Sequence, residues 1–189
     1  MQFSHLHNHS QFSLLDGASK ISSMFKKAKE DNMPAVAITD HGNMFGVFQF
    51  VAEAGKQGVK PIVGCEFYLV NDRHKQVFTK DLKDKRYHQL FLAKNPEGYQ
   101  NLVKLCSLGF MEGMYSKYPR IDKELVLKYH KGLIATTCCL GASVPQAILR
   151  DGEEAAEKEF KWWLDLFGED YYIEVQNHHI PEQQTVNEV

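Results

Sequence analysis

The sequence predicts an α/β fold built around a mainly parallel sheet. Strand-type runs alternate with stretches of helical periodicity along the 189 residues, which is the pattern of βαβ units. Several strand-type runs, such as residues 35–39, are almost continuously apolar, as expected of strands buried on both faces. Six such strands fit a β/α barrel as well as a doubly wound sheet, so the periodicity alone leaves both architectures open.

The first half of the chain alternates strands and helices. Apolar residues at helical spacing from Ile21 onward predict the first helix, with Ser19 as its N-cap. The next helix is expected to stop near Gly58, where glycine favours a helix C-terminus. The predicted strands of this half cover residues 2–7, 35–39, 61–70 and 88–93, and two further helices cover 45–57 and 96–108.

The second half repeats the pattern after two irregular segments. Residues 71–85 are charged and are expected to form an exposed excursion, and residues 115–120 are expected to form a loop. The chain ends within a predicted helix with no strand after it, which indicates a truncated domain. The predicted strands of this half cover residues 132–139 and 171–176, and the helices cover 122–129, 144–150, 153–167 and 181–189.

Composition excludes some classes of protein. The net charge is −2, so the chain has no global basic footprint for nucleic acid, although 22 Lys and Arg residues leave room for a local patch. No apolar run approaches the roughly 18–20 residues of a membrane span, and no secretory signal is visible. The four cysteines lack CxxC spacing, so we expect reduced thiols and a cytoplasmic protein.

Metal-ligating side chains gather at the ends of the predicted strands. In a β/α barrel the carboxyl ends of the strands converge on one rim, where active sites form. The residues concerned are His7 and His9 at the end of the first strand, Asp40 and His41 after the second, Glu66 in the third, Cys139 at the end of 132–139, and His178 and His179 after the last.

These residue types indicate a cluster of metal ions. Residues i and i+2 of a strand point the same way, so His7 and His9 can hold one ion between them. Imidazoles with carboxylates suit Zn, Mn or Fe, and a thiolate favours Zn at one position. The set exceeds the needs of one tetrahedral ion and fits two or three metals, the arrangement that hydrolyses phosphate esters.

Simpler interpretations stand beside this one. Asp40 and His41 could form a turn with a helix N-cap, and the two histidines after residue 176 could be a solvated strand exit. Cys138 and Cys139 are expected to point to opposite faces, so at most one is a ligand. Glu66 is harder to explain without a function, because an unpaired carboxylate in an apolar strand is costly.

Several motifs resemble the polymerase and histidinol phosphatase (PHP) domain family. Residues 7–17 look like its first motif, residues 37–44 its second and residues 64–68 its third. Further phrases resemble the version at the N-terminus of bacterial replicative DNA polymerases, the DNA polymerase III alpha family. These phrases lie at residues 87–95, 101–105, 118–122 and 136–141, and the resemblance runs from residue 1 to about residue 180.

The resemblance implies a distorted (β/α)7 barrel with a three-metal site on its rim. In the polymerase version it implies a metal-dependent 3′–5′ exonuclease and a role in stabilising the polymerase, whereas members that have lost ligands keep only the structural role. Seven of the family's ligand residues are present here, which favours the active class. By position, the implied ligands are His7, His9, Asp16, His41, Glu66, His88 and Cys139.

One family feature is missing. The closing motif, an Asp-x-His near the end of the last strand, does not follow residue 180. The domains that perform nucleotidyl transfer are absent too. We therefore expect residues 1–189 to be an incomplete PHP domain, C-terminally truncated, from the N-terminus of a longer DNA-directed DNA polymerase.

The resemblance also assigns roles and partners. Asp16, Glu66 and Asp40 are the expected catalytic residues, with Glu66 as a bridge between Zn²⁺ or Mn²⁺ ions and Asp40 orienting His41 or capping a helix. The polymerase itself would use Mg²⁺. The expected partners are DNA at a primer terminus, with Lys117 and Arg120 near its backbone, and other subunits of the replicative holoenzyme; no membrane is expected.

Two other functions are compatible with the same residues. One is a free-standing phosphatase of the superfamily, such as a histidinol phosphatase, although the polymerase-like phrases argue against it. The other is a non-enzymatic interaction domain that metals merely brace, because the same ligands serve structural and catalytic sites.

Overall fold

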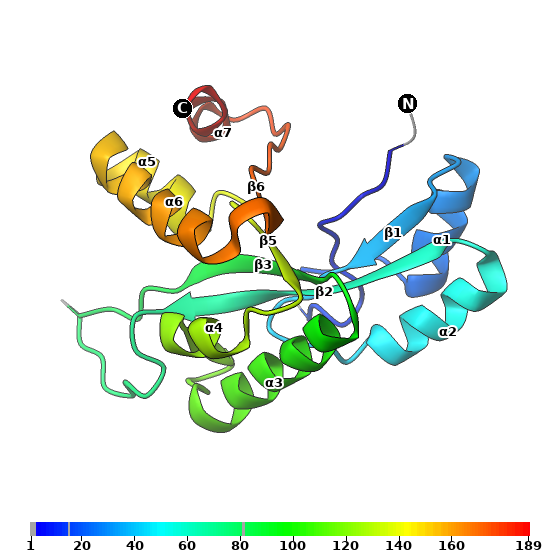
Figure 1. Cartoon of the computed structure of the whole chain (residues 1–189), viewed down its shortest axis with the longest axis horizontal. Coiled ribbons are helices and arrows are strands. Elements are labelled where there is room, and N and C mark those ends of the chain that lie inside the picture. The colour runs from blue at the N-terminus through cyan, green and yellow to red at the C-terminus, as the bar shows by residue number, and fades with distance from the viewer. Residues whose placement is uncertain (1–2, 15, 81) are drawn as a thin grey trace.

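One mixed β-sheet organises the molecule. The computed structural model describes residues 3–14, 16–80 and 82–189. The sheet has the order β1-β2-β3-β5-β6, with β4 beside β2, and Figure 1 shows helices on both sides of it. The strands are β1 (Ala35–Ile38), β2 (Lys60–Val70), β3 (Tyr87–Ala93), β4 (Arg120–Asp122), β5 (Leu133–Thr136) and β6 (Tyr171–Tyr172).

The predicted α/β class is confirmed, and the sheet is mainly parallel as predicted, with β3 as the strand that runs against the others. β2 is parallel to β1 and β4, and β5 is parallel to β6, but β3 is antiparallel to both β2 and β5. A parallel neighbour would need a crossover connection, usually a helix, and no helix lies in the described residues between β2 and β3. In those residues the sheet is open and does not close into a barrel.

Helices occur where the periodicity predicts them, with shifted ends. The chain forms α1 (Ile21–Glu30), α2 (Val47–Gln57), α3 (Pro96–Glu112), α4 (Lys123–Tyr129), α5 (Ser143–Arg150), α6 (Glu153–Phe167), the 3₁₀ turn η1 (Gly168–Asp170) and α7 (Pro181–Glu188). Lys20, not Ser19, precedes α1 as its N-cap residue. The side chain of Asn95 caps α3, accepting from the backbone N–H of Gly98 at 2.9 Å.

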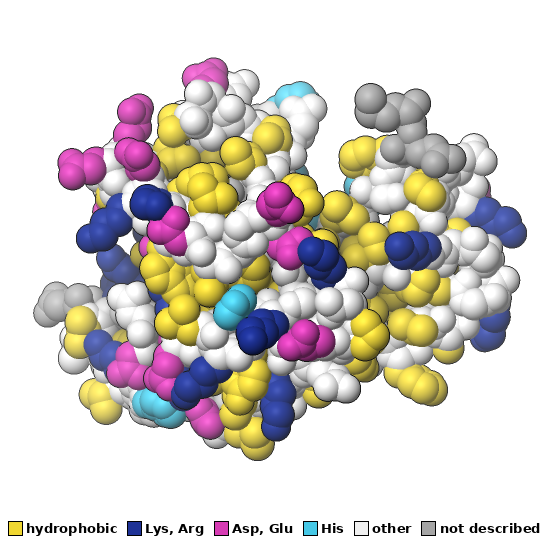
Figure 2. All heavy atoms as spheres, in the orientation of Figure 1, with side chains coloured by type: hydrophobic (Ala, Val, Ile, Leu, Met, Phe, Trp, Pro, Cys, Tyr) yellow, Lys and Arg dark blue, Asp and Glu magenta, His cyan; other side chains and the backbone are white. Residues whose placement is uncertain are grey.

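Three expected strands are shortened or lost, and the one predicted over 132–139 covers only Leu133–Thr136. Residues 3–7 run extended beside β1 but form no regular strand, and Gln2 lies outside the described residues. This segment is held by two backbone hydrogen bonds, from Ala37 N to His5 O (3.0 Å) and from Thr39 N to Asn8 O (2.9 Å). The strand predicted over 171–176 ends after Tyr172. The segment that begins at Phe3 and helix α7 lie on the same side of the sheet (Figure 1), and Figure 2 shows a notch on that side of the molecule.

The core explains which face of β2 is available for chemistry. Alternate side chains of a strand point to opposite faces. Cys65, Phe67 and Leu69 are buried in the main hydrophobic cluster with residues of α3, α4 and α6. Glu66 and Tyr68 therefore point to the other face. No helix in the described ranges combines the length and apolarity that a membrane crossing requires.

The excursion between β2 and β3 is anchored by buried arginines. Arg120 is fully buried, and its guanidinium donates to the carbonyl oxygens of Gly113, Arg73 and Lys75 and to Asp84 Oδ1. Arg73, also buried, pairs with Asp122 at 2.9 Å. The expectation of a purely exposed segment is thus wrong at Arg73. The expectation that Arg120 holds a DNA backbone is wrong too, because its guanidinium is fully buried and all its contacts are inside the protein.

We predict that Arg120→Ala lowers the free energy of unfolding by about 3–5 kcal/mol, because it leaves Asp84 and three carbonyl oxygens without their buried donor. Urea unfolding measures this loss. The exposed neighbour Lys117 provides the control, since Lys117→Ala should stay within about 0.5 kcal/mol of the unmodified chain. Equal effects of the two substitutions would contradict the anchoring role.

Candidate metal centre

Glu66 lies at the centre of a ring of histidines. Its side chain is 1% exposed, and its Oε2 atom lies 3.0 Å from both His7 Nε2 and His9 Nε2. The other oxygen, Oε1, lies 2.6 Å from His88 Nδ1. His41 completes the ring, with its Nδ1 atom 3.2 Å from Oε2. A buried carboxylate is thus surrounded by the side chains best able to neutralise it.

The sheet brings these residues together from distant parts of the sequence. His7 and His9 stand on the extended segment beside β1, and His41 follows β1. The backbone at His41 continues the pairing with β2, since Gly42 N donates to Glu66 O at 2.8 Å. His88 lies opposite Tyr68 at the start of β3. Because β3 is antiparallel to β2, its first residues lie beside the C-terminal half of β2. His88 therefore stands close to Glu66, to which the other histidines also point.

Both vicinal cysteines face Glu66. The Sγ atoms of Cys138 and Cys139 lie 3.7 Å and 3.5 Å from Glu66 Oε1, and that of Cys139 lies 3.4 Å from His88 Nδ1. The expectation that the two thiols point to opposite faces is wrong. The strand β5 ends at Thr136, and Cys138 has a left-handed backbone (φ 59°), so the alternation of a strand does not apply to them.

Asp16 and Asp40 have different surroundings. Asp16 is half exposed, and its Oδ2 atom lies 2.6 Å from His41 Nε2. Asp40 is buried and accepts hydrogen bonds from Ser10 N, Ser10 Oγ and Ser13 Oγ at 2.6–2.7 Å. The structure therefore gives Asp40 the serines as partners, where we expected it to orient the His41 ring. Leu15, inside the first motif, lies outside the described residues.

The loop that carries Asp16 is folded tightly against Asp40. Gly17 N donates to Ser13 O at 2.7 Å, and a Cβ atom at Gly17 would stand 1.9 Å from Ser10 O. Only glycine fits this approach. Asp40 thus supports the loop that presents Asp16 to His41.

Sequence reasoning missed Glu174. Its Oε1 atom lies 2.6 Å from His7 Nδ1, and its Oε2 atom accepts from Thr136 Oγ1 at 2.7 Å. The signal was present, because Glu174 interrupts an apolar strand-type run as Glu66 does. His178 and His179, which sequence reasoning singled out instead, are exposed to solvent.

The contacts set the charges of the cluster. Burial by itself would lower the pKa of His7 and of His88, but carboxylate contacts and, at His88, Cys139 raise each to about 10. Burial would raise the pKa of Glu66, yet its histidine hydrogen bonds hold it well below the usual range. A hydrogen bond from Cys138 lowers the pKa of Cys139, burial opposes this, and His88 lowers it further, to about 5.

The residues present fit a group of metal ions. Three sets have ligand atoms within 4.8 Å of one another, and Glu66 belongs to all three: with His7 and His9, with His41 and His88, and with Cys138 and Cys139. The buried Nδ1 atoms of His9 and His41 have no hydrogen-bond partner among the described residues. Buried polar atoms are normally paired, so the His9 nitrogen is available for a further ligand, whereas His41 Nδ1 already lies 3.2 Å from Glu66 Oε2.

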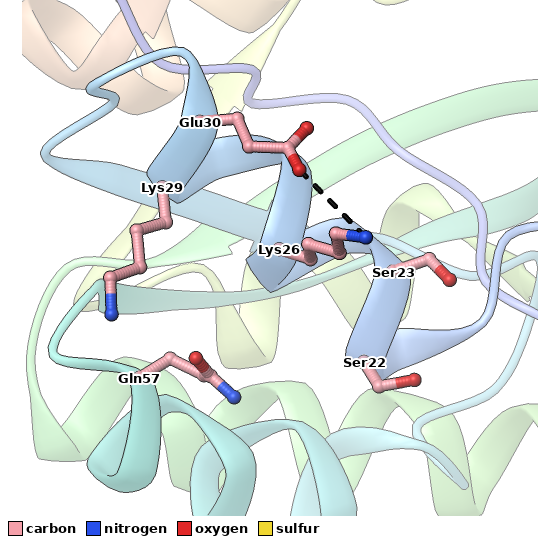
Figure 3. A pocket seen from close by; sticks show the side chains of 6 residues that line it. All are labelled: Ser22, Ser23, Lys26, Lys29, Glu30 and Gln57. Carbon is pink, nitrogen blue, oxygen red and sulfur yellow. Dashed lines mark ion pairs between the residues drawn. The ribbon is translucent and has the colours of Figure 1, made fainter.

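An open cleft of about 630 Å³ leads to this cluster. Its lining includes Asp16, His41 and His88. A second cleft of similar size lies on α1 beside α2 (Figure 3), where the only ion pair drawn joins Lys26 to Glu30 at 3.9 Å. That surface carries no histidine, cysteine or buried carboxylate. The metal-ligating side chains therefore line the cleft beside His88 and not the one on α1.

The fold and the cluster define a class: an α/β domain whose sheet edge presents histidines, carboxylates and a thiol suited to several metal ions. The chain belongs to the PHP domain family, whose profile matches residues 5–178. It is 48% identical over 187 residues to the DNA polymerase III subunit alpha of Borreliella burgdorferi, covering 99% of this chain and 16% of that protein.

A second relative carries the same name. The chain is 47% identical over 192 residues to the DNA polymerase III subunit alpha of Thermus aquaticus, covering 100% of this chain and 16% of that protein. It spans about a sixth of the length of these relatives. Among solved structures, an amidohydrolase from Chromobacterium violaceum matches with a TM-score of 0.40 and 23% identity over 55% of this chain and 32% of that chain.

We predict that the metal-free chain loses stability as pH rises above 6.5. The raised pKa values of His7 and His88 contribute stability that is complete below pH 6.5 and lost as pH rises through about 10. The lowered pKa of Cys139 acts oppositely between pH 5 and 9. Between pH 6.5 and 9 the folded chain therefore holds two extra protons on the histidines and lacks one on Cys139, a net excess of one proton over the unfolded chain. The free energy of unfolding should then fall by about 1.4 kcal/mol per pH unit.

Urea unfolding in a chelator between pH 6.5 and 9 measures this slope. The double substitution His7→Gln with His88→Gln is the control, because it removes both raised pKa values and should flatten or invert the profile. A free energy of unfolding that holds level or rises in the unmodified chain would contradict the assigned charges.

Proposed function

We propose that this domain is a metal-dependent phosphoesterase that holds two or three Zn²⁺ or Mn²⁺ ions. The observation that carries the proposal is the shared carboxylate of Glu66, whose two oxygens face different groups of ligand atoms. A carboxylate in that position can bridge two ions. The buried Nδ1 atom of His9, which has no hydrogen-bond partner among the described residues, supports the same assignment.

The ligand set follows from the geometry. His7, His9 and Glu66 would hold one position, and His41, His88 and Cys139 would complete the others, with Asp16 at the mouth beside His41 and Glu174 behind His7. Ions bound there supply Lewis-acid chemistry: they make water a better nucleophile and neutralise charge on a phosphoryl oxygen.

The protein's own groups would handle protons and orientation. Asp16 is the half-exposed carboxylate of the cleft, 2.6 Å from His41, and it can accept a proton from a water at the cleft floor. Burial lowers the pKa of His41, which favours the neutral imidazole that ligation requires. Glu174 orients the His7 ring from the side opposite Glu66, as outer carboxylates commonly do. Asp40 acts indirectly, through the loop that carries Asp16.

For the whole protein we propose a bacterial replicative DNA polymerase acting in the cytoplasm, with this domain as its 3′–5′ exonuclease module. Identity to DNA polymerase III alpha subunits along the chain supports this. On this proposal DNA at a primer terminus and other holoenzyme subunits are partners, and Mg²⁺ serves the polymerase. We also propose that the open sheet is part of a distorted (β/α)7 barrel that later residues complete.

A structural role is the second candidate. The cluster joins the N-terminal segment to residues on or after β1, β2, β3, β5 and β6, so bound metals would also brace the sheet. A brace needs the ligands but not the exposed carboxylate at the cleft mouth. Asp16 therefore separates the two candidates.

We predict two or three ions per chain by mass spectrometry of protein purified with Zn²⁺ or Mn²⁺, falling when His7 and His9 are replaced by alanine. Asp16→Asn should reduce phosphodiester hydrolysis at least tenfold, on the order expected for losing a proton acceptor, with the free energy of unfolding unchanged. The exposed His179→Ala is the matched control. Absence of bound metal, or full activity of Asp16→Asn, would contradict the proposal.

A further inference from the structure

We propose that Cys138 is a second sulfur ligand of the metal centre, so that the position beside His88 takes Zn²⁺ rather than Mn²⁺. This rests on the proposed function, whose ligand set includes Cys139 as its only thiol, and it names the ion that one position holds. The two thiols and Glu66 form a set whose ligand atoms all lie within 4.8 Å of one another. Cys138 is therefore close enough to the shared carboxylate to bind the same ion.

The two sulfur atoms are spaced like corners of one coordination shell. Cys138 Sγ and Cys139 Sγ lie 3.7 Å and 3.5 Å from Glu66 Oε1, and Cys139 Sγ lies 3.4 Å from His88 Nδ1. In a tetrahedral site with zinc–ligand bonds of roughly 2.0–2.3 Å, the ligand atoms stand about 3.3–3.8 Å apart. His88 Nδ1 and Glu66 Oε1, in contact at 2.6 Å, would separate to admit the ion. Two sulfurs, one nitrogen and one oxygen then make a four-ligand set.

The backbone at Cys138 is held in a conformation that is costly for a cysteine. Its φ of 59° lies in the left-handed region, which glycine adopts readily and residues with a Cβ atom rarely do. The turn is fixed by Cys138 N, which donates to Thr136 Oγ1 at 3.0 Å. Adjacent residues of a regular strand point to opposite faces. This strained turn is what brings two adjacent sulfurs to the same side, toward Glu66.

The surroundings of Cys138 suit a buried ligand. Its side chain is 3% exposed and packs in a small apolar cluster with Leu90. Burial raises the pKa of its thiol, so without an ion the thiol keeps its proton, which coordination would release to solvent. Thiolates select Zn²⁺ over Mn²⁺, whereas imidazoles and carboxylates bind a wider range of ions. A second sulfur would thus distinguish this position from the one at His7 and His9, whose ligand atoms with Glu66 are nitrogens and an oxygen.

The test titrates the metal-free chain, with its thiols reduced, with Co²⁺ and records the near-ultraviolet sulfur-to-cobalt charge-transfer band. Co²⁺ occupies tetrahedral zinc sites, and the band grows with the number of cobalt–sulfur bonds. Cys138→Gly and Cys138→Ala should each keep about half of the band, because one of two such bonds is lost. Competition with a chromophoric chelator should show Zn²⁺ affinity reduced at least about tenfold in both variants, the order found when a metal site is altered.

Two comparisons separate ligation from folding. Cys106→Ala is the matched control and should leave the band unchanged, since this free cysteine lies on α3 beside the main hydrophobic cluster. Glycine at position 138 relieves the left-handed backbone, whereas alanine keeps it. Urea unfolding in a chelator should therefore show Cys138→Gly to be at least as stable as Cys138→Ala, with the same loss of the band in both.

A band of unchanged intensity in both Cys138 variants would overturn the inference. It would leave the proposed function standing, because that function needs Cys139 alone among the thiols. The two-sulfur band in a chain that hydrolyses no phosphodiester would support the inference and contradict the proposed function.

Discussion

A single buried carboxylate constrains the rest of the structure. Glu66 is 1% exposed in the middle of a strand whose neighbours form the hydrophobic core, and a lone charge there would cost several kcal/mol. Four histidines remove that cost, and they come from three separate parts of the chain: His7 and His9 from the N-terminal segment, His41 from the residues after β1, and His88 from the start of β3. The sheet must therefore bring the N-terminal segment, the residues after β1 and the start of β3 to one edge. The fold and the site are consequences of the same requirement.

A second buried charge holds the segment between β2 and β3 in place. Arg120 on β4 is fully buried, and it holds the connection between β2 and β3 through its carbonyl and carboxylate partners. Because β4 pairs with the end of β2, this anchor lies at the same end of the strand as Tyr68 and His88. One strand thus organises both the ligand cluster and the segment between β2 and β3.

In the ion-free chain, protons take the place of metals. The raised pKa values of His7 and His88 favour charged rings beside Glu66, Glu174 and Cys139, whose own pKa values are lowered. Metal ions would compete for the same lone pairs, because ligands must lose their protons to bind. The contacts that stabilise this end of the sheet therefore also hold the metal-ligating side chains close together. Asp16 lies at the exposed mouth of the cleft and takes the smallest part in these contacts.

The sequence by itself determined the class and order of most elements, although it missed β4 and predicted an N-terminal strand that does not form. It also singled out most of the residues that meet around Glu66, because burial periodicity and the chemistry of side chains are local properties. It identified Glu66 as exceptional for the same reason. Only the tertiary structure decided the direction of β3, the shared orientation of Cys138 and Cys139, the serine partners of Asp40 and the burial of Arg120. It also decided that Glu174, rather than the histidines that follow it, reaches the cluster. Each of these features depends on which distant segment of the chain packs against the residue concerned. The apolar pattern of a strand indicates that the strand is buried but not which segment covers it.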